Sequence, residues 1–187
     1  MDSRFDAALR QLGSQLGSQL GAAQIDRTAY YQSLARLLHG RFRPTRVNIW
    51  RLAPSSADGR RVLECLAGYD PSPLTAPSRA SLSEHESGPY LAVLADRGVY
   101  VSSDALADPA LAPMRTSYLV PGLVEALMDA AISINGVIVG VVCCEQIGRT
   151  RVWTQPEITA MRRAISTVNV HLARLAADDA RAGEAPG

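Results

Sequence analysis

Lysine is absent from the sequence, and neither charge is in excess. All 19 basic residues are arginines, 18 acidic residues balance them, and the formal net charge is +1. A surface that binds nucleic acid needs clustered positive charge to contact phosphates, whereas these arginines are interspersed with acidic residues. We therefore expect no nucleic-acid partner.

Long apolar runs are missing as well. The most apolar stretch, residues 130–144, is shorter than the ~20 residues that a membrane helix needs, and Asn135-Gly136 interrupts it. The amino-terminal segment carries charges at Asp2, Arg4 and Asp6 and has no continuous apolar region of the kind found in signal peptides. We expect neither a membrane partner nor a secretory leader.

Cysteine is scarce. Cys65, Cys143 and Cys144 form an odd set without the spacing of a disulfide framework or a zinc site. Free thiols are typical of a reducing compartment, so we expect a cytoplasmic protein. The three histidines are widely spaced and show no metal-ligand pattern, and no metal cofactor is expected.

What the sequence does contain is enough apolar material for one folded domain. Hydrophobic residues make up 47% of its 187 positions, an ordinary value for a globular chain. Their spacing alternates between helical and strand periods and predicts a mixed α/β protein. The expected elements are a helix from Asp26 to Gly40, strands at 47–52 and 61–69, a loop over 70–88, a short helix at 89–95, a strand at 99–101, a loop with a helical turn at 104–117, strands at 124–134 and 137–146, and a helix from 155 to 175.

The two ends of the chain are expected to lie outside the main domain, which spans residues 25–175. Residues 176–187 are small and charged and predict a disordered tail. Residues 1–24 contain a Gln-Leu-Gly-Ser repeat that would place its leucines on one helical face. Each glycine costs about 1 kcal/mol relative to alanine inside a helix. Two interpretations therefore stay open, a helix that pairs with a second subunit or a frayed leader.

The clearest local signal is a β-hairpin over residues 124–146. Asn135-Gly136 is the strongest two-residue turn sequence, and a tight turn there fixes how the two strands pair. With strict alternation, one face of the hairpin is wholly apolar and suited to cover by helices. The other face carries Asp129 and Cys144 among small residues, a composition that favours a cavity wall. Strict alternation puts Glu145 on the helix-covered face, and a β-bulge would turn it towards the cavity.

Several motifs follow one another in an order shared with a known family. They are Tyr118-Leu119, the hairpin with its Asn-Gly turn, the strand Gly140 to Glu145, and Arg151-Val-Trp-Thr before the last helix. From about Thr28 to Leu175 the chain resembles the GAF domain family, the small-molecule-sensing modules of bacterial signalling proteins and phytochromes. The resemblance implies an α/β (α+β) fold with a central antiparallel sheet of five to six strands. Terminal helices would cover one face, and ligand-pocket loops and short helices would cover the other.

The candidate ligand-binding residues are Tyr90, Arg115, Tyr118, Asp129, Cys144 and Glu145. By similarity to bilin-binding relatives, Arg115 and Tyr118 occupy pocket-lining positions, and Tyr90 lies on the expected roof helix. Asp129 has two interpretations. It anchors a ligand, because burying an unpaired charge is costly, or it is bonded to backbone amides of the roof loop, which we favour.

The resemblance does not extend to a cofactor. Some bilin-binding relatives carry a thioether-forming Cys followed by His shortly before Tyr-Leu, whereas this chain has Met114-Arg115. Glu145 stands where His is common after the second strand's Cys. Covalent bilin attachment at that site is therefore excluded, and noncovalent bilin is not favoured. The signature of cyclic-nucleotide-binding members is not recognisable, so the cofactor stays unknown.

Three functions follow from these observations. The first is a sensory or regulatory module for an unidentified small molecule, forming a homodimer through its terminal helices or acting on a signalling partner in trans. The second is a domain without a ligand that only dimerises or docks. The third is a free methionine sulfoxide reductase, which is disfavoured because loops 70–88 and 104–117 contain no cysteine. We expect the first, and not an enzyme.

Overall fold

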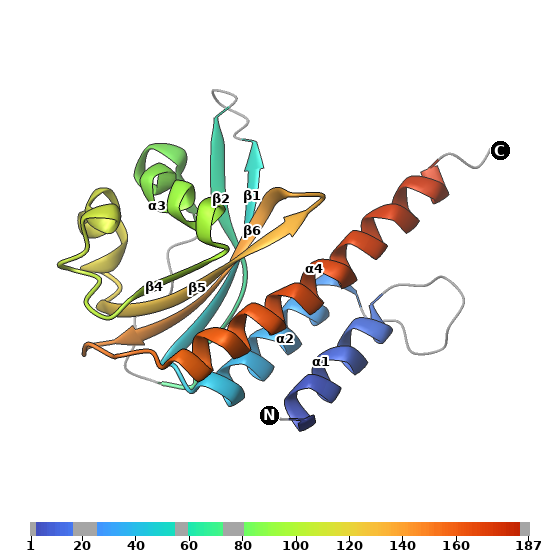
Figure 1. The fold of residues 1–187 in the computed structure, drawn as a ribbon. Coiled ribbons are helices and arrows are strands. Elements are labelled where there is room, and N and C mark those ends of the chain that lie inside the picture. The colour runs from blue at the N-terminus through green and yellow to red at the C-terminus, as the bar shows by residue number, and fades with distance from the viewer. Residues whose placement is uncertain (1–2, 17–25, 55–59, 73–80, 184–187) are drawn as a thin grey trace.

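A six-stranded antiparallel sheet forms the middle layer of the protein (Figure 1). The structure is a computed structural model that describes residues 3–16, 26–54, 60–72 and 81–183, with side chains described as far as Ala177. The strands lie in the order β3-β2-β1-β6-β5-β4, and every neighbouring pair is antiparallel. Their bounds are β1 (Arg46–Pro54), β2 (Arg61–Tyr69), β3 (Ser81–Ser83), β4 (Val99–Ser102), β5 (Val124–Ile134) and β6 (Val137–Ile147).

Three helices lie on one side of the sheet, which we call the helix side; two of them pack on the strands, and the amino-terminal one packs on those two helices (Figure 1). They are α1 (Ser3–Gln15), α2 (Arg27–Phe42) and α4 (Gln155–Gly183). Their apolar side chains form one core cluster with strand residues such as Val47, Met128 and Val142. α4 runs to Gly183, through part of the segment that was expected to be a disordered tail. The residues after Leu175 are rich in alanine, the best helix former, which explains the longer helix.

The opposite face of the sheet is covered by short segments. They are α3 (Glu84–Arg97), η1 (Pro109–Met114) and η2 (Arg115–Leu119). We call these segments the roof and this face the roof side. α3 begins inside the predicted loop 70–88 because Ser83 and Glu86 form a reciprocal capping box, which gives the helix an earlier start than its apolar pattern indicated. β3 lies in the same predicted loop.

The starts of α2 and α4 were predicted correctly, and the end of α2 was not. Asp26 Oδ1 accepts a hydrogen bond from the Ala29 amide at 2.7 Å and caps α2. The Glu157 carboxylate accepts from the Thr154 amide at 2.8 Å, as the capping box before α4 predicted. α2 passes through Gly40, its expected stop, and ends at Phe42 before a left-handed residue.

Arg151 ties α2 to α4. Its Nη2 donates hydrogen bonds of 2.7 Å to the Phe42 carbonyl and to Glu157 Oε1. Its Nη1 donates to the Arg43 carbonyl at 3.0 Å. The guanidinium also lies 3.9 Å from the centroid of the Trp153 ring, a cation–π contact. One side chain therefore satisfies carbonyls at the end of α2 and fixes the first turn of α4.

α1 packs on its own domain. Phe5, Leu9 and Leu12 are buried in the helix-side cluster. A Cβ atom at Gly13 would lie 2.0 Å from the ring of His171 on α4, so a larger residue there would force His171 to move. The close approach expected from the glycine repeat is thus made, at this position, to a helix of the same chain. The later glycines of the repeat lie outside the described residues, and dimerisation stays a prediction.

The hairpin is confirmed, but its register differs from strict alternation. Asn135 and Gly136 have φ angles of 51° and 80°, the positive values that the tight turn needs. Ser133 then pairs with Ile138 and Ile132 with Gly140, so that Val139 is an extra residue in β6. This β-bulge moves the pairing of the rest of β6 by one position.

The bulge decides which side chains of β6 face the roof. Cys143 and Glu145 point to the roof side, and Cys144 lies in the helix-side cluster. The predicted placement of Cys144 on the cavity face is therefore wrong. The alternative considered for Glu145, a bulge that turns it towards the roof, is the arrangement in the structure.

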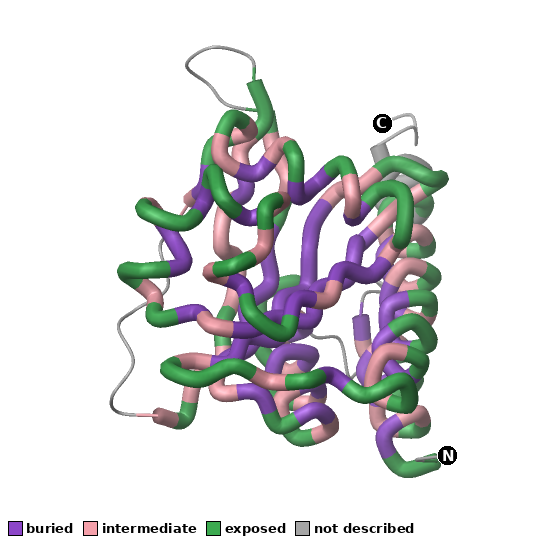
Figure 2. The backbone as a smooth tube through the Cα atoms, turned by 60° about the vertical axis from the view of Figure 1, so that its left-hand side comes forward, coloured by how far each residue is buried: buried purple, intermediate pink, exposed green. Residues whose placement is uncertain are grey.

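Burial follows the layers. Buried residues run along the central strands and the inner faces of the helices, and exposed residues lie on the outer faces (Figure 2). None of the helices in the described ranges combines the length and the hydrophobicity that crossing a membrane requires.

Candidate functional site

The candidate site lies on the roof side of β1, β6 and β5, where buried polar residues line up across the strands. Arg46 pairs with Glu145, and Asn48 pairs with Cys143. Cys143 in turn pairs with Asp129 on β5. The four polar residues of this set are at most 2% exposed. Because buried polar groups need partners, the way these groups bond determines what the site can do.

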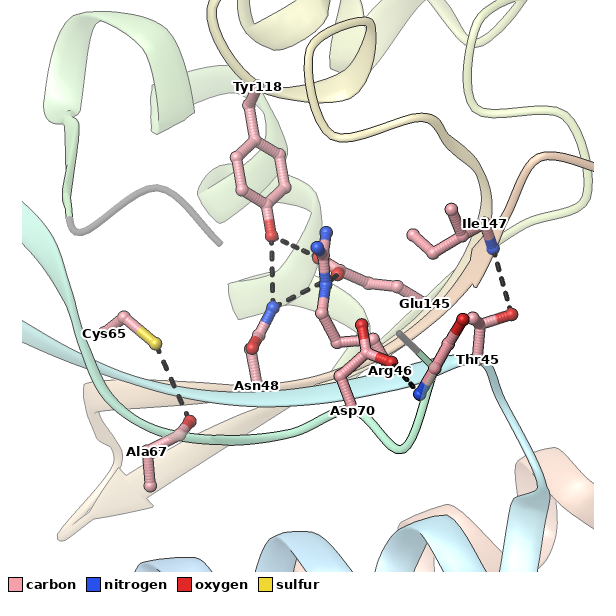
Figure 3. A network of polar contacts seen from close by, with 10 residues as sticks. Thr45, Arg46, Asn48, Cys65, Ala67, Asp70, Tyr118, Glu145 and Ile147 are labelled. Carbon is pink, nitrogen blue, oxygen red and sulfur yellow. Dashed lines mark hydrogen bonds and ion pairs between the residues drawn. The ribbon is translucent and has the colours of Figure 1, made fainter. Parts of the chain in front are cut away.

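Glu145 is the centre of the first network (Figure 3). Arg46 Nε donates to Glu145 Oε2 at 2.6 Å, and Asn48 Nδ2 donates to the same oxygen at 3.1 Å. The Tyr118 hydroxyl, reaching down from η2, donates to the other oxygen, Oε1. The Tyr118 ring meets Trp50 edge-on with the ring centroids 5.7 Å apart. A residue of the roof is thus bonded to a buried ion pair on the sheet.

Asp129 is the centre of the second network. The Tyr90 hydroxyl on α3 donates to Asp129 Oδ2 at 2.7 Å. The other oxygen, Oδ1, has no hydrogen-bond partner of standard geometry among the described residues. Tyr100 of β4 lies opposite Asp129 of β5 in the sheet. Its ring meets the Tyr90 ring edge-on, with the ring centroids 5.2 Å apart. The second roof contact is therefore also a tyrosine hydroxyl on a buried carboxyl group.

The two carboxyl groups have different surroundings. Burial raises the pKa of Asp129 to about 8, with a further rise from the Glu145 charge, while the hydrogen bond from Tyr90 acts in the opposite direction. Asp129 is therefore mostly protonated at neutral pH. Glu145 has the Arg46 guanidinium at 2.6 Å instead. Burial acts to lower the pKa of Arg46, but Glu145 outweighs it and raises it.

The remaining groups of the site are held in their neutral forms. Burial, followed by the nearby Glu145 charge, raises the pKa of Tyr118. Burial also raises the pKa of Cys143 and of Cys144, with the Asp129 charge adding to both. A protonated, buried thiol is a poor nucleophile. Within the described ranges no group of three or more His, Cys, Asp or Glu side chains could hold a metal ion.

The model of the GAF domain family matches residues 1–172 of the chain. The chain belongs to the GAF domain family. No curated protein sequence matches it. The match includes residues 1–24 as well as the sheet and the roof.

Solved structures share the fold of this GAF domain. The blue-light absorbing form of the PixJ GAF domain from Thermosynechococcus elongatus is 18% identical with a TM-score of 0.71, over 84% of this chain and 91% of that chain. A bacteriophytochrome of R. palustris is 15% identical with a TM-score of 0.68, over 92% of this chain and 36% of that chain. The photosensory core module of Stigmatella aurantiaca phytochrome is 16% identical with a TM-score of 0.67, over 94% of this chain and 37% of that chain. At these identities the likeness shows the fold, and it confirms the predicted GAF-like sheet with helices on one face.

The GAF fold brings four of the six predicted site residues to the roof side. They are Tyr90, Tyr118, Asp129 and Glu145. Cys144 lies on the helix side, and Arg115 is exposed at the start of η2. Asp129 accepts a hydrogen bond from the Tyr90 hydroxyl on α3. The sequence analysis had favoured backbone amides of a roof loop as its partners. Whether any of these residues binds a ligand stays a prediction.

Three residues of β1 belong to the site and were missed. Arg46, Asn48 and Trp50 are all buried on the roof side of the GAF domain. A signal for them was present in the sequence, because polar residues at alternate positions of an apolar strand mark one face of the sheet. A buried Arg in such a strand also needs a carboxylate partner, and Glu145 is that partner.

Proposed function

We propose that this GAF domain is a sensory or regulatory module of bacterial signal transduction that binds a small molecule between the roof and the sheet. The signal would pass through the terminal helices to a second copy of the chain or to a partner protein. The observation that carries the proposal is that neighbouring residues of β6 contact the two opposite layers of the domain. Glu145 bonds to the roof, and its neighbour Cys144 packs among the helices. The solved structures of similar fold come from a cyanobacteriochrome receptor and from phytochromes, which supports a sensory role.

Tyr118 is the residue through which a ligand would act. It is 6% exposed and fills the space between η2 and the sheet beside Trp50. A ligand that takes over the hydrogen bond to Glu145 would release Tyr118 and with it η2. A ligand that binds better when the roof is open shifts the protein towards that state. The roof and the helices pack on opposite faces of β5 and β6, so these strands connect the two layers.

The test is a thermal-shift and native mass spectrometry screen of nucleotides, tetrapyrroles, fatty acids and amino acids against the full chain. A ligand of the proposed kind changes the NMR signals of Tyr118 and Glu145. Its affinity should change in the variant Tyr118→Phe, which loses only the hydroxyl, and should stay the same in the matched control Tyr69→Phe on the helix side. The proposal is contradicted if no compound in the screen binds, or if a ligand binds Tyr118→Phe with the same affinity as the unchanged chain.

The route through the terminal helices has its own test. Val170 on α4 is 47% exposed, an apolar side chain at the surface of a terminal helix. A dimer formed through α4 should dissociate in the variant Val170→Asp, measured by light scattering during size exclusion. Val137→Asp is the control, because Val137 is 62% exposed and lies beside the hairpin turn rather than on a helix. A dimer that survives Val170→Asp, or that Val137→Asp also breaks, counts against this route.

A second candidate is an interaction domain without a ligand. It is favoured by how fully the chain's own side chains occupy the roof side, where Trp50, Tyr90 and Tyr118 are 2%, 3% and 6% exposed. The same screen separates the two candidates, because this one requires that no small molecule changes the signals of the roof.

A further inference from the structure

A cavity lies on the helix side, at the end of the sheet where the β5–β6 hairpin turns. Its volume is about 140 Å³. The lining residues come from two helices and four strands, and they are mostly apolar. They include Tyr31, Leu66, Ile132, Val139, Leu172 and Leu175. The cavity is separate from the networks of Asp129 and Glu145, which are on the other face of the sheet.

Two β-bulges build this cavity. Leu66 is the extra residue of β2, because Ile49 pairs with Ala67 and Trp50 pairs with Cys65. The extra residue of β6, Val139, also lines the cavity. A bulge redirects a side chain and bends its strand, and bulges are over-represented beside functional sites. Two of them, one on each strand that flanks β1, converge on one small space.

Two arginines line the solvent side of the cavity. Arg27 and the side chain of Arg51 are exposed and line the cavity with the Tyr31 side chain. Burial raises the pKa of Tyr31, while the charges of Arg27 and Arg51 act to lower it. Glu64 binds Arg51 through Nη2 at 2.5 Å. A guanidinium has five N–H donors, so this contact leaves Arg51 able to bind a second carboxylate.

We propose that this cavity is a second small-molecule site, for a small carboxylate with an apolar body. The body would enter the apolar part between the two bulged strands and α4, and the carboxylate would lie at Arg51 and Arg27. An apolar cavity of about 150 Å³ holds one benzene ring, so the site has room for a body of that size. Arginine binds carboxylates with paired N–H donors, which gives the site its preference for an acid over a neutral analogue.

The position of the cavity gives such a ligand a route to the rest of the protein. Leu172, Leu175 and Ala176 of α4 form one wall of it. In Figure 1 α4 continues beyond this point, past the end of the sheet. A ligand in the cavity would therefore contact α4 next to the segment of the helix that continues past the sheet. This contact requires no change in the roof. The site would be an input independent of the proposed roof-side ligand.

The test uses benzoate as the probe and the full chain labelled with nitrogen-15. Titration to millimolar benzoate should give saturable NMR shifts at the amides of Ile134, Val139 and Leu172. Benzamide, which has the same shape without the charge, should bind at least about tenfold more weakly, and so should benzoate to the variant Arg51→Gln. Val139→Phe, which fills the cavity, should abolish binding while the other amide signals show a folded protein.

The matched control is Arg36→Gln, which replaces an exposed arginine on α2 that lies over the Tyr69 ring and does not line this cavity. It should bind benzoate as tightly as the unchanged chain. The inference is overturned if benzoate gives no saturable shifts, or if benzamide binds equally well. It is also overturned if Arg51→Gln and Arg36→Gln weaken binding alike, or if the shifts appear at Tyr118 and Glu145 instead.

Discussion

Replacing Asp129 by asparagine should remove a large pH dependence from the stability of this domain. Burial raises the pKa of this carboxyl group to about 8, from an ordinary value of 3.8. Between these two values the folded state keeps a proton that the unfolded state has released. The folded state is therefore destabilised progressively as the pH rises through this window, and the loss is complete above the folded pKa.

The size of the effect follows from the width of the window. About four pH units at about 1.4 kcal/mol each amount to a cost on the order of 5 kcal/mol at alkaline pH. Asparagine keeps an oxygen that can accept the hydrogen bond of Tyr90, but it cannot ionise. Asp129→Asn should therefore be more stable than the unchanged protein near pH 8, and the advantage should shrink towards pH 5.

The assay is urea denaturation followed by tryptophan fluorescence at several values between about pH 5 and pH 8, the window in which the effect develops. The free energy of unfolding of the unchanged chain should approach that of Asp129→Asn as the pH falls. Asp96→Asn serves as the control because Asp96 is exposed on α3, and its curve should run parallel to that of the unchanged chain. If Asp129→Asn also runs parallel, Asp129 does not hold its proton in the folded state and the reasoning fails.

The other predictions concern packing and the buried ion pair. Glu145→Ala should lower the free energy of unfolding by about 3–5 kcal/mol in urea denaturation, because it removes the carboxylate that pairs with the buried Arg46 guanidinium; a loss below about 1 kcal/mol would mean that water reaches the site. Gly13→Leu should lower the thermal midpoint, with a loss of about 1–3 kcal/mol from overpacking against His171, and an unchanged midpoint would show that α1 does not approach α4 so closely. Gly40→Ala should raise stability by up to about 1 kcal/mol, since nothing lies within 4 Å of the added methyl group, and any loss in thermal denaturation would contradict that.

Local chemistry made much of the fold predictable. Asn135-Gly136 determines a tight turn on its own, and the Thr154–Glu157 capping box marks a helix start without help from the rest of the chain. These signals act between residues that are close in sequence. The extent of α4 was missed for the opposite reason, because a helix of small residues looks like a tail until its propensity is weighed.

The candidate site was predictable only in part. Asp129 and Tyr118 were found from the strand pattern and from the family resemblance. Sequence alternation could not place Cys144 and Glu145, because a bulge depends on how two strands pair and leaves no mark at the residue that it inserts. Arg46 was missed because its role depends on a partner 99 positions away in the sequence.

The contacts of Arg151 fix the first turn of α4, so a sideways push on the helix would turn it about that end. Its first turn is clamped to the end of α2, whereas Gly183 lies beyond the sheet (Figure 1). With a rise of about 1.5 Å per residue, Leu172 lies about 27 Å from the pivot at Thr154 and Gly183 about 43 Å from it. A sideways push of about 1 Å at Leu172 therefore moves the tip by about 1.6 Å if the helix stays straight. Loosening the pivot by Arg151→Ala would uncouple the two movements while leaving both faces of the sheet intact.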